Sequence, residues 1–197
     1  MSKPRLTQTD IEEAAQDYGA GIEPALLWAV ADVESTGSGF LPDGRPKILF
    51  EGHIFWGRLR ARGLDPIAVS NQSPTICFPK WTRAYYKGGT REYERLAEAV
   101  SYHPQAALES ASWGMFQLMG FNYAAAGFRS VEEMVRAHYQ SERQHLRAIV
   151  RWMKSNGLLT RLAAKDWEGF TRGYNGPGQV EVYSKRLKAA YEKRQAA

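Results

Sequence analysis

The sequence predicts a mainly α-helical protein with one short β-hairpin. Most segments are bounded by helix start and stop signals, and only one stretch carries a convincing strand signal. The chain has 197 residues, 44% of them hydrophobic, which is enough for one substantial core. We therefore expect a single globular unit over residues 1–197.

The expected helices are marked by caps at their starts and by glycine or proline at their ends. Thr9 with Glu12, and Ser130 with Glu133, fit capping boxes. The helix that opens at Thr9 is expected to end near Gly19. In chain order, further helices are expected at residues 24–35, 52–62, 90–102, 104–111, 115–126, 130–157 with a break near 140–144, 166–174 and 180–194.

The strand signal lies between the second and third expected helices. The turn dipeptide Asp43-Gly44 leads into the apolar stretch at residues 47–50. Further on, the stretch that ends at Trp81 carries several prolines and is expected to be irregular. Such a loop either carries function or only connects elements, and both interpretations stay open.

Charge and residue usage exclude some classes of protein. The formal net charge of +5 favours an anionic partner, but no nucleic-acid-binding motif accompanies it, so we expect no nucleic-acid partner. Cys77 is the single cysteine, which excludes an internal disulfide. The four histidines lack metal-ligand spacing, and we expect neither a metal nor a cofactor. No secretory signal and no membrane span is recognisable.

Glu34 is the first candidate for catalysis. Leu27, Val30 and Glu34 fall at positions i, i+3 and i+7, so the carboxyl group shares a helix face with side chains that are expected to enter the core. Partial desolvation raises the pKa of a carboxyl group, as a general acid requires. A solvated or arginine-paired glutamate at the helix end is the alternative interpretation.

Asp43 is the second candidate, nine positions further on at the start of the expected hairpin. Two carboxyl groups in unlike environments are the usual equipment for glycoside hydrolysis. In that case one protonates the leaving oxygen and the other holds a water molecule. An aspartate that only forms a turn is the alternative, because Asp-Gly is a common turn dipeptide.

Three separated segments carry a family resemblance. In order, they are VESTGSGF at residues 33–40, SWGMFQLMG at 112–120 and GYNGPG at 173–178. They resemble the Glu-Ser, Gly-Leu-Met-Gln and Tyr-Asn-Gly motifs of the lysozyme-like superfamily, which includes goose-type lysozymes and lytic transglycosylases. The run at 33–55 is similar to the N-acetylmuramidase domain of phage endolysins. This resemblance covers nearly the whole chain and leaves no room for a separate cell-wall-binding domain.

The resemblance implies a role for each matching residue. Glu34 becomes the catalytic acid, and Asp43 the base or water-positioning group. Gln117 matches a glutamine that lines the sugar cleft, while Tyr174 and Asn175 match the aromatic and the amide that contact substrate near the acid. Without the family pattern, a surface glutamine and a turn-forming Asn-Gly would be favoured.

Four weaker candidates for substrate binding lie in family-like segments. They are Arg45, Glu51, Glu109 and Ser112. Glu51 and Glu109 either line the cleft or form buried salt bridges, and both interpretations stay open. Phe116 stands where the transglycosylases have leucine, a change of packing that removes no catalytic group.

The resemblance implies an endolysin that hydrolyses the β-1,4 bond between N-acetylmuramic acid and N-acetylglucosamine in peptidoglycan and so lyses the host. Configuration is inverted if the two carboxyl groups admit a water molecule between them. A lytic transglycosylase, in which Glu34 acts alone, and a non-catalytic peptidoglycan-binding protein are the alternatives. Asp43 favours hydrolysis.

The expected partners and location follow from the same resemblance. We expect a monomer that binds glycan strands, accumulates in the host cytoplasm and reaches the wall through a separate pore. The basic stretch at residues 185–194 is amphipathic. It either contacts anionic envelope lipids or forms a solvated terminal helix.

Overall fold

The computed structural model describes residues 3–18, 21–35 and 37–196, and it confirms a mainly helical fold with a small sheet. Within these residues the helices are α1 (Gln8–Glu13), α2 (Pro24–Glu34), α3 (Gly52–Arg60), α4 (Pro66–Gln72), α5 (Glu92–Tyr102), α6 (Pro104–Glu109), α7 (Val131–His138), α8 (Glu142–Ser155), α9 (Leu158–Ala163), α10 (Trp167–Asn175) and α11 (Val180–Gln195). Three short irregular helices accompany them: η1 (Ala14–Tyr18), η2 (Gly89–Arg91) and η3 (Gly120–Asn122). None of the helices in the described part of the chain is long and apolar enough to cross a membrane.

The sheet has three antiparallel strands in the order β1 (Ile48–Phe50), β2 (Ala111–Trp113) and β3 (Leu118–Met119). β2 and β3 form a hairpin, and β1 joins it from about 60 residues earlier in the chain. Ser112 is the central residue, opposite Leu49 on one side and Met119 on the other. This pairing brings residues 48–50, which follow the turn expected at Asp43-Gly44, next to the segment at 112–120.

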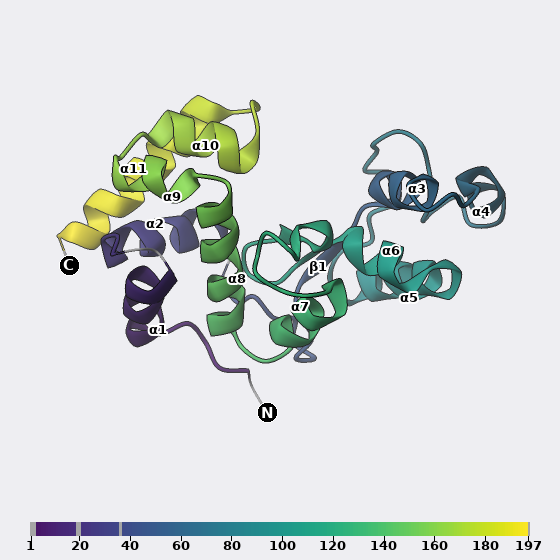
Figure 1. Ribbon diagram of the computed structural model, residues 1–197, viewed down its shortest axis with the longest axis horizontal. Coiled ribbons are helices and arrows are strands. Elements are labelled where there is room, and N and C mark those ends of the chain that lie inside the picture. Colours follow the sequence, from purple (N-terminus) through teal and green to yellow (C-terminus); the bar gives the residue numbers. More distant parts are fainter. Residues whose placement is uncertain (1–2, 19–20, 36, 197) are drawn as a thin grey trace.

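The helices lie on two sides of the sheet (Figure 1). α1, α2 and α9 to α11 lie on one side, and α3 to α6 lie on the other, with α7 and α8 near the sheet between them. α11 packs against both α2 and α10. The core includes Leu26 and Leu27 of α2 and Trp113 of β2, all almost fully buried. α5 and α6 contact the sheet, whereas α8 contacts η1 and α9 on the other side and the β2–β3 turn through His145. The ends of α2 and α10 are held together by the contact between Glu34 and Asn175.

The first helix starts two residues before the expected capping box. Thr7, not Thr9, is the N-cap: its hydroxyl accepts the Asp10 N–H, and the Asp10 carboxylate accepts the Thr7 N–H at 3.0 Å. Aspartate replaces the glutamate of the usual box, which is why the sequence pattern pointed to Thr9. Gly19, where this helix was expected to end, lies outside the described residues. Ser130 caps α7 as expected.

The prediction of a helix at residues 115–126 is wrong. This segment forms the turn after β2, then β3 and η3. The backbone of Gly114 and Gln117 has positive φ, which interrupts an α-helix. Pairing of Leu118 with Trp113 stabilises the strand instead, and this is a contact that helical periodicity does not detect. The stretch before Trp81 is also less irregular than expected, because it contains α4.

Candidate active site

Glu34 is the last residue of α2, and its carboxyl group is partly removed from water. α2 starts with Pro24, whose fixed φ suits a first turn, and buries Leu27 and Val30 on the face that leads to Glu34. Ser35 then leaves the helix in extended backbone, with its hydroxyl donating to a carbonyl one turn earlier at 2.6 Å. Burial raises the pKa of Glu34 because the charged form loses hydration. A carboxyl group that retains its proton nearer to neutral pH is suited to general acid catalysis.

Asn175 lies beside Glu34, although 141 positions separate them in the sequence. Its Nδ2 donates to Glu34 Oε1 at 3.2 Å and to Oε2 at 3.3 Å. Asn175 is the last residue of α10, which Asp166 caps by accepting the Gly169 N–H at 3.0 Å. Hydrogen bonding to the ionised form lowers the pKa of Glu34 and so partly offsets the effect of burial. The amide thus stabilises the carboxylate that remains after the proton has left.

Tyr174 lies close to Glu34, among aromatic side chains. Its ring stacks on Phe170 at a centroid distance of 5.4 Å and meets Trp152 edge-on at 5.6 Å. Burial, and then the charge of Glu34, raise the pKa of Tyr174 well above its usual value, so its hydroxyl stays protonated. This hydroxyl is buried and makes no hydrogen bond within the described residues. The ring packs on Phe170 and Trp152 and does not line the cavity of Glu34, which favours support of the acid over stacking of the ring on a sugar.

A cavity of about 460 Å³ opens in front of Glu34. It is lined by the segment after α2, by β1, by the β2–β3 turn and by Gly89 at the start of η2. Glu34 is the only carboxylic acid among the described residues that line it. Lys47 and Gln117 add polar groups, and Leu41 and Met115 add apolar surface. Mixed polar and apolar walls around one partly buried acid suit a sugar ligand.

Gln117 reaches the cavity from a strained position in the β2–β3 turn. Its φ is 49°, which is a conformation that favours glycine. Its Nε2 donates to Gly114 O at 2.8 Å, and its Oε1 accepts from Ser112 Oγ at 2.8 Å. Ser112 is 5% exposed, so it acts on Gln117 from behind the cavity wall. Strain of this kind persists where surrounding contacts over-determine a functional position.

Asp43 lies on an exposed turn and is paired with Arg45. Arg45 Nη2 and Nε both approach Asp43 Oδ2, at 2.7 and 2.8 Å, and the Arg45 N–H donates to Oδ1 at 3.0 Å. The guanidinium lies 4.0 Å from the centroid of the Tyr93 ring. Hydrogen bonds from Arg45 lower the pKa of Asp43, so it is ionised at neutral pH. Neither Asp43 nor Arg45 is among the residues that line the cavity of Glu34.

The chain matches the family model of N-acetylmuramidases over residues 23–195. The chain belongs to the N-acetylmuramidase family. It also resembles the solved structure titled "Crystal structure of Burkholderia AP3 phage endolysin", with 38% sequence identity and a TM-score of 0.91. That match covers 100% of this chain and 74% of the other. A comparison with curated proteins finds no match.

Family membership confirms that this muramidase is a glycoside hydrolase with a lysozyme-like helical fold. Its substrate class is peptidoglycan. The match to the family model includes Glu34 and Gln117, which line one cavity, and Asn175, which donates to Glu34.

The two other acids proposed from the sequence lie outside this cavity and have protein partners. Glu51 accepts from Tyr86 Oη at 2.7 Å and lies 3.3 Å from His53 Nδ1, just before α3 begins. Glu109 is buried and accepts from Arg62 Nη2 at 2.7 Å. For both acids the geometry favours the salt-bridge or second-layer interpretation over direct contact with substrate.

Four residues of the muramidase cavity are not singled out by the sequence. They are Ser38, Leu41, Lys47 and Met115. Three of them lie in segments that carry a signal, at residues 33–40, 47–50 and 112–120. These signals do not indicate which residue faces the ligand, because Lys47 and Met115 reach one cavity only through the pairing of β1 with β2, across more than 60 positions.

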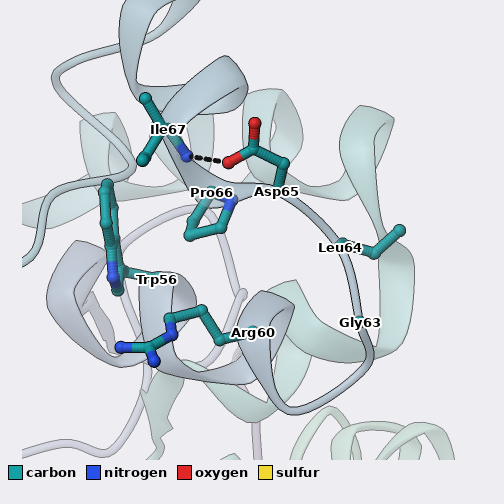
Figure 2. Close-up of a pocket in the computed structure, with 7 residues that line it drawn as sticks. All are labelled: Trp56, Arg60, Gly63, Leu64, Asp65, Pro66 and Ile67. Atoms are coloured by element: carbon teal, nitrogen blue, oxygen red, sulfur yellow. Dashed lines mark hydrogen bonds between the residues drawn. The ribbon is translucent and has the colours of Figure 1, made fainter.

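A second hollow, of about 490 Å³, lies between α3 and α4 of the muramidase. Figure 2 shows Trp56 and Arg60 of α3 on one side and Pro66 and Ile67 of α4 on the other. None of the candidate catalytic or binding residues lines it. In the described part of the chain, no three histidine, cysteine or acidic side chains gather into a metal-binding group.

Proposed function

We propose that the protein hydrolyses the β-1,4 bond between N-acetylmuramic acid and N-acetylglucosamine, with Glu34 as the acid. The observation that carries this proposal is the carboxyl group of Glu34: it is partly buried, its pKa is raised, and among the described residues it is the one carboxyl group that lines the cavity. The strained Gln117 adds an amide to the cavity wall, a group suited to the N-acetyl and hydroxyl groups of sugars.

In the first step, Glu34 donates its proton to the glycosidic oxygen as the bond to the sugar carbon breaks. The leaving sugar then departs as an alcohol, and positive charge develops on the remaining ring, as in other glycoside hydrolases. The Glu34 carboxylate that is left carries a negative charge close to that ring. Asn175 stabilises it through the two hydrogen bonds at 3.2 and 3.3 Å.

In the second step, a water molecule attacks the sugar carbon and loses a proton to the Glu34 carboxylate, which restores the acid. We assign this base role to Glu34 because Asp43 is paired with Arg45 on an exposed turn. Asp43 then acts on the shape of the turn at 41–45, where the Leu41 N–H also donates to Arg45 O at 2.8 Å. This replaces the sequence-based hypothesis of a water-orienting Asp43.

A single acid in the cavity also suits a lytic transglycosylase, in which the 6-hydroxyl of N-acetylmuramic acid attacks in place of water. The family match to N-acetylmuramidases favours hydrolysis. Mass analysis of fragments released from purified peptidoglycan decides between them. Hydrolysis predicts chains that end in reducible N-acetylmuramic acid, whereas anhydro ends would overturn the hydrolytic proposal.

We further propose that the protein acts as an endolysin, by similarity to the phage endolysin that it matches at 38% identity. In this role, the protein acts as a monomer. It accumulates in the host cytoplasm and reaches the wall through a separate pore. Lys185 and Lys188 of α11 are well exposed, although each has an acidic neighbour one turn away. Sedimentation with anionic vesicles tests whether α11 contacts envelope lipids.

A further inference from the structure

Glu142, at the start of α8, holds the segment that follows the catalytic helix. Its Oε1 accepts from the Gly39 N–H at 2.7 Å and from Ser38 Oγ at 3.0 Å. Ser38 lines the cavity together with Glu34. One carboxylate oxygen therefore fixes the first wall of the cavity from a position 103 to 104 residues away in the chain.

The carboxylate of Glu142 is almost completely buried, with 2% of the residue exposed. Its Oε2 accepts from the Leu6 N–H at 2.8 Å, so two backbone N–H groups and one hydroxyl hydrogen-bond to it. Its place in the first turn of α8 adds the favourable field of a helix N-terminus. Removing the carboxylate would leave the N–H groups of Gly39 and Leu6 without their acceptor, so Glu142 fixes both backbone segments to α8. The segment at Ser38 and Gly39 includes a residue that lines the cavity, which connects Glu142 to the site.

His145, one turn further along α8, holds the second wall. Its Nδ1 accepts from the Met115 N–H at 3.2 Å, and its Nε2 donates to His138 O at 2.7 Å. Burial lowers the pKa of His145 to about 4, so the ring is neutral near pH 7 and Nδ1 remains an acceptor. Met115 lines the cavity in the β2–β3 turn, two positions before Gln117.

The imidazole of His145 lies where the two walls meet. A Cβ atom placed on Gly39 would lie 2.6 Å from His145 Nδ1 and 2.9 Å from Met115 Cβ, and one placed on Gly114 would lie 2.8 Å from the same nitrogen. Both glycines therefore lie directly against the ring, and Gly39 also lies directly against Met115. Displacing the ring would change how the two walls pack against each other.

We propose that Glu142 and His145 are positioning residues that fix the two cavity walls relative to each other and thereby set the fit of the glycan strand. Glu142 attaches the Ser38–Gly39 wall to α8, and His145 attaches the Gly114–Met115 wall to the same helix. The inference rests on the proposed function, because it takes this cavity to be the glycan site. Neither residue contacts the reacting atoms, so their effect is on binding and alignment.

The test measures binding apart from catalysis. In a Glu34→Gln background, the dissociation constant for a soluble tetrasaccharide of alternating N-acetylglucosamine and N-acetylmuramic acid is compared with and without Glu142→Gln. Glutamine offers one acceptor oxygen where the carboxylate offers two, so it cannot accept both from the Leu6 N–H and from the Ser38–Gly39 wall, and we expect the dissociation constant to rise at least about fivefold. The matched control is Met153→Ala, a fully buried site on the same helix that lowers stability without touching either wall. It is expected to stay within about twofold at equal folded fraction.

An equal change in Glu142→Gln and Met153→Ala, or no change in either, overturns the positioning role. If Glu142→Gln does not fold, Ser38→Ala removes one donor to the same carboxylate from the half-buried side and is expected to raise the dissociation constant about two- to threefold. Unchanged binding in Ser38→Ala would then overturn the positioning role of Glu142. The binding readout does not depend on turnover, so activity that survives in Glu34→Gln alone would contradict the catalytic proposal and leave this one standing.

Discussion

The side-chain amide of Asn175 donates to both carboxylate oxygens of Glu34, at 3.2 and 3.3 Å. Burial raises the pKa of Glu34, and this amide lowers it. The ends of α2 and α10 therefore set the acidity of one carboxyl group between them. The pH dependence of activity therefore depends on Asn175 as well as on the burial of Glu34.

Asn175→Ala is expected to raise the pKa of Glu34, because the ionised form loses its hydrogen bonds while burial remains. Activity that needs the protonated acid then persists to higher pH, so the basic limb of the pH–rate profile moves upward. The rate at the optimum falls by about tenfold or more because the carboxylate left in the first step is less stable. Fragment release from peptidoglycan between pH 4 and 9 measures both effects. A basic limb that moves downward would contradict this account.

Asp43→Asn is expected to retain activity within about fivefold of the wild type, because an exposed ion pair contributes little to stability. The same small effect is expected for Arg45→Gln, which removes the other partner. Initial rates on peptidoglycan at neutral pH test this. A loss of a hundredfold or more at unchanged KM, seen in Asp43→Asn alone, would restore Asp43 as the base.

Gln117→Gly separates function from stability. Glycine adopts the positive φ at this position without strain, so the melting temperature is expected to stay within about 3 °C of the wild type despite the lost hydrogen bonds. The side chain that lines the cavity is lost, and KM is expected to rise about three- to tenfold. Steady-state kinetics with thermal unfolding of the same samples gives both numbers. An unchanged KM would exclude Gln117 from substrate binding.

Glu109→Gln, in contrast, is expected to lower stability and leave the kinetics unchanged. It breaks a buried ion pair with Arg62, which lowers the free energy of unfolding by about 2–4 kcal/mol and the melting temperature by roughly 5–10 °C. Because Glu109 does not line the cavity, kcat measured well below that temperature stays within about twofold. A selective loss of kcat would assign Glu109 to the site.

The parts of the fold that could be predicted from the sequence are those with local signals. Pro24 at the start of α2 and Asp166 before α10 act through their own and adjacent backbone, and both helices lie within one or two residues of their expected bounds. The amphipathic position of Glu34 depends only on helical spacing, and the partly buried carboxyl group confirms it.

The parts of the fold and of the site that could not be predicted depend on contacts between distant segments. Residues 115–126 have helical periodicity, but their pairing with Trp113 and Ser112 imposes a hairpin. Glu142 and His145 look like ordinary members of an amphipathic helix until the fold brings Gly39 and Met115 to them. For Asp43 the local contact decides instead. Its spacing from Glu34 suggested a catalytic pair, but its carboxylate forms an ion pair with the neighbouring Arg45.

The most direct test of the central claim is the rate at which Glu34→Gln releases soluble fragments from purified peptidoglycan, beside the wild type at the same folded fraction. Glutamine keeps the shape and the contact with Asn175 but has no acidic proton to donate. The account predicts a loss of about a thousandfold or more, with the melting temperature not lowered. Activity within tenfold of the wild type would contradict Glu34 as the catalytic acid.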